Sequence, residues 1–363
     1  MATKGDAPKI INLALQGGGS HGAFSWGVLD RLLEDPRIEI EAITGASAGA
    51  MNAVALAAGY HAGDREEARE SLRKFWNGVL DEARTSPLRR SPIEAMLSGW
   101  GLDASPTYVM FDLVTRLASP YDLNPYNLNP LKDLVVQLVD FDRVRKSKVK
   151  VFISATNVET GRAQVWDKKQ LSADHVMASA CLPWLFQAVE IDGVPYWDGG
   201  FTGNPALWPL FESCESDDVV LVQINPIKRP GAPKTARDII NRVNEITFNA
   251  ALLHDLRAVD FVTRLIEAGR LEGTDYRRIL MHAIADEKGM ADLGASSKFN
   301  VEPDFIDMLF TTGREAAENW LHTSFRHVGA RSTVNIRKMF QGEDDALDGG
   351  QLKPPRKRPK APE

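Results

Sequence analysis

The chain has 363 residues, of which 44% are hydrophobic, and its 43 Lys and Arg against 49 Asp and Glu give a net charge of −6. With this apolar content, only 2 cysteines and no excess of Gly or Pro, the composition excludes a disordered chain, a disulfide-stapled domain and a collagen-like or low-complexity protein. The negative charge gives no reason to expect nucleic acid as a partner.

Membrane insertion and export are not expected either. No stretch approaches the roughly 18 consecutive apolar residues of a membrane span. The N-terminal segment lacks the apolar core of a secretory signal, which predicts a cytoplasmic protein. Cys181 and Cys214 have no metal-binding or redox spacing, and we expect both to be ordinary buried thiols.

The first 60 residues predict four alternating elements. The apolar run 9–15 is expected to be a strand, 22–34 a helix, 38–44 a second strand and 48–59 an alanine-rich helix. This β-α-β-α order predicts an α/β fold with a mainly parallel sheet and helices on both faces.

The later segments are less regular. Residues 61–85 have the pattern of one charged amphipathic helix, and the proline-interrupted segment 86–130 is expected to be a cap or insertion over the sheet. Asp192-Gly193 predicts a tight hairpin turn. The remaining strands and helices are expected at 149–155, 163–166, 189–197, 219–224, 235–268, 279–284 and 302–326. Residues 343–363, with a basic run at 353–360, are expected to form a disordered tail.

A glycine-rich turn, Gly17-Gly18-Gly19-Ser20-His21-Gly22, lies between the first strand and its helix. Backbone N–H groups and the positive end of a helix gather there and attract negative charge. Two uses compete. The turn matches a dinucleotide fingerprint, with Glu39 or Glu41 as the ribose carboxylate, and it also suits an oxyanion hole for acyl transfer.

The next turn favours acyl transfer. Gly45-Ala46-Ser47-Ala48-Gly49 is a G-x-S-x-G pattern between the second strand and its helix, which is the context of a nucleophile elbow. Small residues on both sides let such a turn close and leave the Ser47 hydroxyl exposed. A dinucleotide fold would place an acidic residue at the end of the second strand, where this chain has Ile43-Thr44.

A base must activate Ser47, and the best candidate is Asp198. None of the seven histidines lies on a glycine-bounded loop after an expected strand, and only two strands precede Ser47, which argues against the triad of an ordinary α/β-hydrolase. Asp198 ends the hairpin strand and is followed by Gly199-Gly200, which allow close approach. A carboxylate is a useful base near neutral pH only where apolar neighbours raise its pKa, and Trp197 and Phe201 are the neighbours expected to do so.

The same tripeptide recurs at Asp348-Gly349-Gly350, but it follows no expected strand, so we reject it as the base. Seven apolar residues within 86–130 are expected either to line an acyl-chain channel or lid, or to form the core of the cap. They are Met96, Leu97, Trp100, Leu102, Tyr108, Met110 and Phe111.

Taken together, the glycine turn, the serine turn and Asp198-Gly199-Gly200, in this order and each at a strand end, resemble the three blocks of the patatin-like phospholipases. The segment Ala178–Pro183 and the pair Asn204-Pro205 add to the similarity, which extends over about residues 9–225. The resemblance implies a three-layer α/β/α fold in a single domain over residues 9–340. It also implies hydrolysis of lipid acyl esters through an acyl-enzyme, without metal or cofactor.

By position, the resemblance assigns the roles in a Ser–Asp dyad. Ser47 is the nucleophile, Asp198 is the general base, and the amides of Gly17, Gly18 and Gly19 form the oxyanion hole. The supporting positions of the motifs are Gly22, Gly45, Gly49, Gly199 and Gly200.

One departure and two alternatives stay open. Family members commonly carry Arg or Lys where this chain has His21, so a fixed positive charge is replaced by a titratable one and the preference for anionic phospholipids is left open. The alternatives are a serine hydrolase of a soluble ester, thioester or polyester, and an inactive acyl-lipid-binding regulatory protein. The expected partner is a lipid or acyl-ester substrate, met by peripheral contact at the inner membrane face. Headgroup, acyl position, protein partners and oligomeric state are not predicted.

Overall fold

The computed structural model describes residues 7–84, 90–91, 94, 99–103 and 105–342. Their central element is an eight-stranded sheet of order β5-β6-β3-β2-β1-β7-β8, with β4 paired to β3. Strands β3, β2, β1, β7 and β8 are parallel, β4 and β6 run antiparallel to β3, and β5 runs antiparallel to β6. The prediction of a mainly parallel sheet in an α/β fold is therefore confirmed. The strands are β1 Lys9–Leu15, β2 Ile38–Gly45, β3 Lys150–Asn157, β4 Ala163–Asp167, β5 Val189–Ile191, β6 Val194–Asp198, β7 Asp218–Gln223 and β8 Leu280–Ala285.

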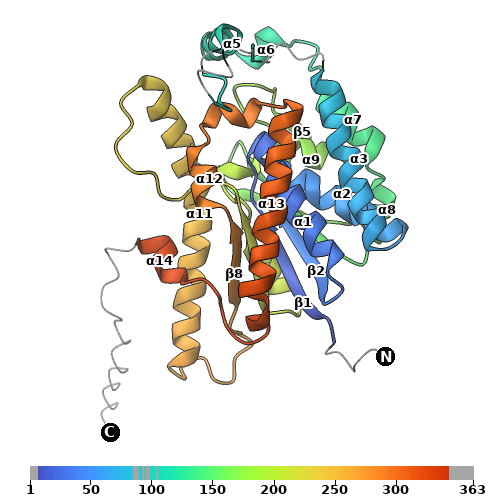
Figure 1. Ribbon diagram of the computed structural model, residues 1–363, viewed down its shortest axis with the longest axis vertical. Coiled ribbons are helices and arrows are strands. Elements are labelled where there is room, and N and C mark those ends of the chain that lie inside the picture. The colour runs from blue at the N-terminus through green and yellow to red at the C-terminus, as the bar shows by residue number, and fades with distance from the viewer. Residues whose placement is uncertain (1–6, 85–89, 92–93, 95–98, 104, 343–363) are drawn as a thin grey trace.

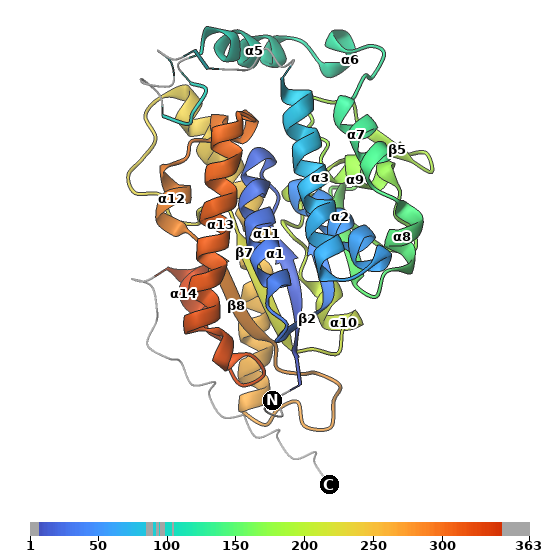
Figure 2. The same ribbon diagram turned by 45° about the vertical axis from the view of Figure 1, so that its right-hand side comes forward.

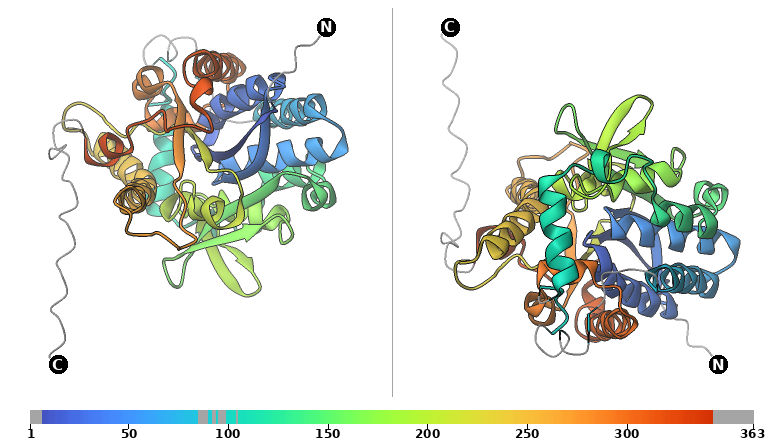
Figure 3. Two further views of the ribbon diagram at one scale, coloured as in Figure 1. Left: turned by 90° about the horizontal axis from the view of Figure 1, so that it is seen from below. Right: turned by 90° about the horizontal axis from the view of Figure 1, so that it is seen from above.

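Helices cover both faces of this sheet (Figures 1 and 3). They are α1 Gly22–Glu34, α2 Ala48–Ala62, α3 Arg65–Ala83, α5 Pro106–Leu117, α6 Pro120–Leu123, α7 Pro130–Leu138, α8 Phe141–Lys146, α9 Ala173–Ser179, α10 Trp208–Ser213, α11 Ala236–Glu267, α12 Glu287–Asp292, α13 Pro303–Thr323 and α14 Ile336–Gln341. Four short 3-10 helices are η1 Gly19–His21, η2 Gly199–Phe201, η3 Ala295–Phe299 and η4 Phe325–His327.

The layers follow from alternation along the strands. Leu13 of β1 and Val220 of β7 pack with α1, α2, α3 and α13 on one face of the sheet. Their neighbours Ala14 and Leu221 pack with α10, α11 and α14 on the other face. Because both faces are covered, the central strands are apolar along most of their length.

Most expected elements are found within a few residues of their predicted ends. The single helix expected at 61–85 is divided between α2 and α3, because the Asp64 side chain accepts hydrogen bonds from the N–H groups of Glu66 and Glu67 and starts a new helix. The predicted hairpin turn is confirmed, since Asp192 and Gly193 both have positive φ, 52° and 78°. Both cysteines are buried free thiols, as expected.

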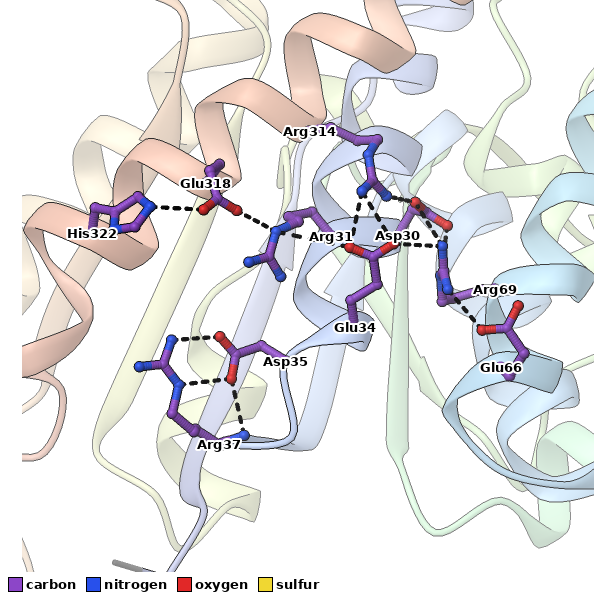
Figure 4. Close-up of polar contacts among 10 residues, drawn as sticks. All are labelled: Asp30, Arg31, Glu34, Asp35, Arg37, Glu66, Arg69, Arg314, Glu318 and His322. Carbon is purple, nitrogen blue, oxygen red and sulfur yellow. Dashed lines mark hydrogen bonds and ion pairs between the residues drawn. The ribbon is translucent and has the colours of Figure 1, made fainter. Parts of the chain in front are cut away.

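A network of ion pairs ties α1 to the helices on either side of it (Figure 4). Arg69 of α3 lies 2.8 Å from Asp30 and 2.7 Å from Glu34, both on α1. Arg314 of α13 pairs with the same two carboxylates. The two carboxylates of α1 therefore link α3 and α13 through a single network of ion pairs.

Helices α5 and α6 lie at one end of the molecule, far from the start of β1 (Figures 1 and 2). They belong to the segment 86–130, and they extend across the end where the parallel strands terminate. Met96, Leu97 and the tail 343–363 lie outside the described residues. Within the part of the chain that the structure describes, no helix has the length and apolar character needed to cross a bilayer.

Candidate active site

Ser47 stands at the tip of a strained turn between β2 and α2. Its φ is 53°, a value that residues other than glycine rarely adopt. The turn is held by the Ser47 N–H, which donates to the carbonyl oxygen of Ser179 at 3.1 Å and lies 2.9 Å from the Ser179 hydroxyl. A Cβ at Gly49 would lie 2.3 Å from the Leu15 carbonyl oxygen, so a side chain there would force β1 and α2 apart. The G-x-S-x-G pattern thus forms a closed strand–turn–helix unit.

Strand β3 brings Asp198 to this turn. Gly45, near the end of β2, pairs with Ile153, and Asp198, at the end of β6, pairs with Ala155. Because β2 runs parallel and β6 antiparallel to β3, their carboxyl ends meet about 7 Å apart along the same strand. Both Ser47 and Asp198 line one pocket.

The Asp198 carboxyl group is buried, with 1% of its residue surface exposed. Its Oδ1 accepts a hydrogen bond of 2.6 Å from the Gly200 N–H. Burial raises the pKa of Asp198 to about 7, although hydrogen bonding by the Gly200 N–H and the Ser47 hydroxyl and the charge of Lys298 act in the opposite direction. A carboxylate with such a pKa can accept a proton near neutral pH.

The second oxygen, Asp198 Oδ2, is buried and has no hydrogen-bond partner of ordinary geometry among the described residues. The interaction of the carboxyl group with the Ser47 hydroxyl is therefore weaker than an ordinary hydrogen bond. Catalytic pairs are often loose without substrate and tighten when it binds.

The apolar surroundings of Asp198 differ in part from those predicted. Phe201 lines the pocket as expected, and its ring lies 5.2 Å from that of Phe248 and 6.3 Å from that of Trp184. Trp197 does not line the pocket, because alternation along β6 turns it to the opposite face from Asp198. Phe248 and Trp184 come from segments for which no site residue was expected.

The pocket has a volume of about 560 Å³ and is largely apolar at its walls. Tyr108 and Phe111 of α5 line it, as two of the seven expected cap residues. Trp100 instead packs against Phe305, with 5.2 Å between the two ring centres. Leu102 is buried, and Met110 is exposed. A volume of this order is typical of pockets that bind a small organic ligand.

A larger hollow, of about 720 Å³, lies near α11 and α14 and contains none of the expected site residues. Its four arginines are engaged. Arg264 and Arg337 pair with Asp260, Arg278 pairs with Glu267, and Arg331 contacts the His327 ring. We therefore place the candidate site in the smaller pocket.

The glycine turn faces Ser47, but its three amides are not equivalent. The Gly17 N–H already donates to Asn204 Oδ1 at 2.6 Å, and its carbonyl accepts from Asn225 Nδ2 at 2.8 Å. A Cβ at Gly17 would lie 2.6 Å from the Ala46 carbonyl oxygen, so this glycine lets the two turns approach. The Gly17 N–H is therefore not free to donate a hydrogen bond to a ligand in the pocket.

Gly18 and Gly19 do line the pocket, and within the described chain we find no hydrogen bond from either amide. Gly19 has a φ of 58°, which favours glycine. The other expected motif glycines have structural roles: a Cβ at Gly22 would lie 2.6 Å from the Ala48 side chain, and one at Gly199 would lie 2.1 Å from the Ser154 carbonyl oxygen.

His21 does not supply a positive charge. It is buried, and its Nε2 makes a 2.8 Å hydrogen bond with the Ser297 hydroxyl. Burial, with the charges of Lys298 and Arg229, holds its pKa well below the ordinary value for histidine, so it is neutral near pH 7. The expectation of a titratable charge at this position is corrected: the imidazole is kept neutral by its surroundings.

Three side chains of the site were missed by the sequence. Asn204 belongs to a pair that resembles the family but has no expected role, and Asn225 and Lys298 lie in segments without a motif. Among the described residues, no group of three or more His, Cys, Asp or Glu side chains could hold a metal ion.

Comparison with known proteins identifies the family. Residues 13–211, more than half of the chain, match the family model described as patatin-like phospholipase. A search of curated proteins gave no match. Among solved structures, VipD from Legionella pneumophila is 14% identical, with 87% of this chain and 67% of that chain covered and a TM-score of 0.41. ExoU, solved with SpcU from the type III secretion system of Pseudomonas aeruginosa, is 15% identical, with coverages of 90% and 53% and a TM-score of 0.37. The chain thus spans about two thirds of the length of VipD and about half of that of ExoU.

Proposed function

Because the chain belongs to the patatin-like phospholipase family, a class of lipid hydrolases, we propose that it hydrolyses lipid acyl esters through an acyl-enzyme on Ser47. One observation carries the proposal. A serine on a strained turn and a buried carboxyl group whose pKa is raised to about 7 line the same apolar pocket. This combination suits a nucleophile and its base.

In the proposed first step, the ionised Asp198 carboxylate takes the proton of Ser47 as Oγ attacks the ester carbonyl carbon. The tetrahedral intermediate then collapses, the bond to the alcohol or lysolipid breaks, and Asp198 returns the proton to the departing oxygen. Water repeats these steps on the acyl-enzyme and releases the fatty acid. The base is close to half ionised near neutral pH, which lets it serve in both directions.

The amides of Gly18 and Gly19 are the proposed donors to the oxyanion. Both residues line the pocket beside Ser47, whereas the Gly17 amide is engaged by Asn204. Donors fixed before the reaction stabilise charge that develops only in the transition state. Asn204 and Asn225 hold the backbone of Gly17 and so keep the turn in place.

The proposed hydrolase domain is a single domain that extends over residues 9–340. Segments beyond the family match complete the pocket, since α11 contributes Phe248 and η3 contributes Lys298 and Phe299. A cytoplasmic location stays a prediction.

Contact with a lipid surface is proposed through an apolar rim around the pocket mouth. We define the rim as Met110, Leu113 and Leu117 of α5 together with Trp184, Ile240 and Val243. All six side chains are exposed, from 37% for Ile240 to 78% for Leu117. Trp184, Ile240 and Val243 also line the pocket, so the rim continues into the site.

Helix α5 is apolar on two sides. Tyr108 and Phe111 face the pocket, while Met110, Leu113 and Leu117 recur at helical spacing on the exposed side. A helix that exposes apolar side chains to solvent beside an apolar pocket is suited to lie on a membrane surface. Because α5 pairs its Asp112 with Arg116, docking would depend on apolar contact more than on charge.

Leu113→Asp combined with Leu117→Asp should lower binding to phospholipid vesicles at least about tenfold, since two apolar side chains no longer enter the lipid. Vesicle co-sedimentation measures this, with hydrolysis of monomeric p-nitrophenyl butyrate as the reference for an intact site. Tyr276→Asp is the matched control, because Tyr276 is 64% exposed but lies beyond the far end of α11. Equal vesicle binding by the wild type and the double variant would refute the proposal that the rim contacts the lipid surface.

The proposed function is tested by fatty-acid release from phosphatidylcholine or phosphatidylglycerol vesicles. Wild-type protein should release fatty acid, and Ser47→Ala should not. Hydrolysis of p-nitrophenyl butyrate without release from any phospholipid would favour a soluble-ester hydrolase instead. Inactivity on both substrates would favour a lipid-binding protein without catalysis.

A further inference from the structure

A lysine outside every sequence motif reaches into the pocket. Lys298 lies in η3 and lines the pocket together with Ser47, Asp198 and Gly18. Its Nζ donates a 2.7 Å hydrogen bond to Asn225 Oδ1 and lies 5.7 Å from the centre of the Phe248 ring. The ammonium is therefore held at a defined place in the pocket instead of extending into solvent.

That place is beside the glycine turn. A Cβ at Gly18 would lie 3.6 Å from Asn225 Oδ1, the oxygen that accepts from Lys298. The backbone of Lys298 also contacts the glycine turn. Its carbonyl oxygen would lie 2.4 Å from a Cβ at Gly19, and the same oxygen accepts a 3.0 Å hydrogen bond from the Ser20 hydroxyl. The ammonium and the amides proposed to bind the oxyanion thus stand at one edge of the pocket.

His21 positions the segment that carries this charge. Its imidazole bonds to the hydroxyl of Ser297, the residue before Lys298. The neutral histidine of the turn therefore anchors η3, and the positive charge that the turn itself lacks comes from Lys298.

Lys298 makes no ion pair with any described residue of the chain. The nearby carboxylate of Glu245 is occupied, since Arg229 Nη2 lies 2.7 Å and Arg242 Nη1 3.1 Å from its oxygens. Arg229, Arg242 and Lys298 thus surround the single carboxylate of Glu245, so this cluster of four side chains has a net positive charge. Lys298 is half-buried, and a partly desolvated ammonium that makes no ion pair is unfavourable, so an anionic ligand would relieve that cost.

We propose that Lys298 binds the phosphate group of a phospholipid substrate, so that the pocket selects phosphate-bearing lipids over neutral esters. The inference rests on the proposed function, because it requires that Ser47 attack the acyl ester of the same molecule. A phosphate diester carries one negative charge and accepts charge-assisted hydrogen bonds from an ammonium. In a glycerophospholipid one glycerol unit carries both the esters and the phosphate, so an ester at the glycine turn brings the phosphate to its vicinity.

The protonation of Lys298 makes the proposal sensitive to pH. Burial lowers its pKa to about 8. The charged and titratable groups that face it are Glu245, Arg229, Asp198 and His21. Ionisation of Asp198 affects kcat/KM equally for every ester. The ratio of kcat/KM for a phospholipid to kcat/KM for a neutral ester therefore reports the effect of Lys298 protonation alone.

The test compares dihexanoylphosphatidylcholine, as monomers, with p-nitrophenyl butyrate. Lys298→Met should lower the phospholipid-to-neutral-ester ratio of kcat/KM at least about tenfold, mainly through a higher KM for the phospholipid. Lys298→Arg should restore most of the ratio. In the wild type the ratio should fall as the pH rises through about 8, and this fall should be absent in Lys298→Arg, whose charge persists. Lys288→Met, at an exposed lysine of α12, is the matched control.

Each outcome decides the proposal. An equal loss on both substrates, or an unchanged ratio in Lys298→Met, would overturn it. Hydrolysis of p-nitrophenyl butyrate but not of the phospholipid by the wild type would also overturn it while leaving the serine hydrolase intact. Inactivity of the wild type on both substrates would instead refute the proposed function itself.

Discussion

Ser47→Ala and Asp198→Asn should each lower kcat for p-nitrophenyl butyrate by at least about 10³-fold. The first variant removes the nucleophile, and the second leaves an amide that cannot accept the serine proton. Because the two groups act in one step, the double variant should be no slower than Ser47→Ala alone. Steady-state turnover measures the effect, and circular dichroism verifies that each variant is folded.

The control comes from the chain itself. Asp348→Asn alters the same Asp-Gly-Gly tripeptide at a position outside the described residues, and it should retain wild-type turnover. If Ser47→Ala or Asp198→Asn hydrolyses the ester at the wild-type rate, the dyad is refuted.

The raised pKa of Asp198 should be visible in both catalysis and stability. Only the ionised carboxylate can act as base, so kcat/KM for a neutral ester should rise with pH to a plateau, with an apparent pKa of about 7. Folding favours the protonated acid, because the pKa of Asp198 is about 7 in the folded protein against a reference value of 3.8. The ionised group therefore destabilises the fold increasingly from about pH 4 to pH 7 and by a constant amount above pH 7.

Asp198→Asn should consequently stabilise the protein at alkaline pH. The gain in free energy of unfolding should be near zero at pH 4, rise with pH and level off at up to about 4 kcal/mol above pH 7. Urea unfolding of both proteins between pH 5 and pH 8.5 measures it. Asp292→Asn, at an exposed aspartate of α12, should lack this trend. A gain that is independent of pH would show that burial does not raise the pKa of Asp198.

Local patterns predicted the strands and helices of the sheet well. The alternation of short apolar runs with helical repeats predicts β1, α1, β2 and α2. The serine turn could be predicted because the segments on both of its sides have a clear strand or helix periodicity. The pairing of strands was not readable in this way. That β6 runs antiparallel to β3, so that Asp198 meets the turn of Ser47, is a property of the assembled sheet.

The chemistry around the dyad was harder to predict, because it depends on burial and on distant segments. His21 looked like a titratable charge from sequence, yet its surroundings keep it neutral. The Gly17 amide looked available, yet Asn204 occupies it. Lys298 carries no local signal at all, since its role depends on the docking of η3 against the glycine turn.

The most direct test of the central claim is covalent labelling with a fluorophosphonate probe, followed by mass spectrometry of the labelled peptide. The account predicts a single adduct on Ser47, none in Ser47→Ala, and much slower labelling in Asp198→Asn. An adduct on another residue, or no adduct in folded wild-type protein, would contradict it.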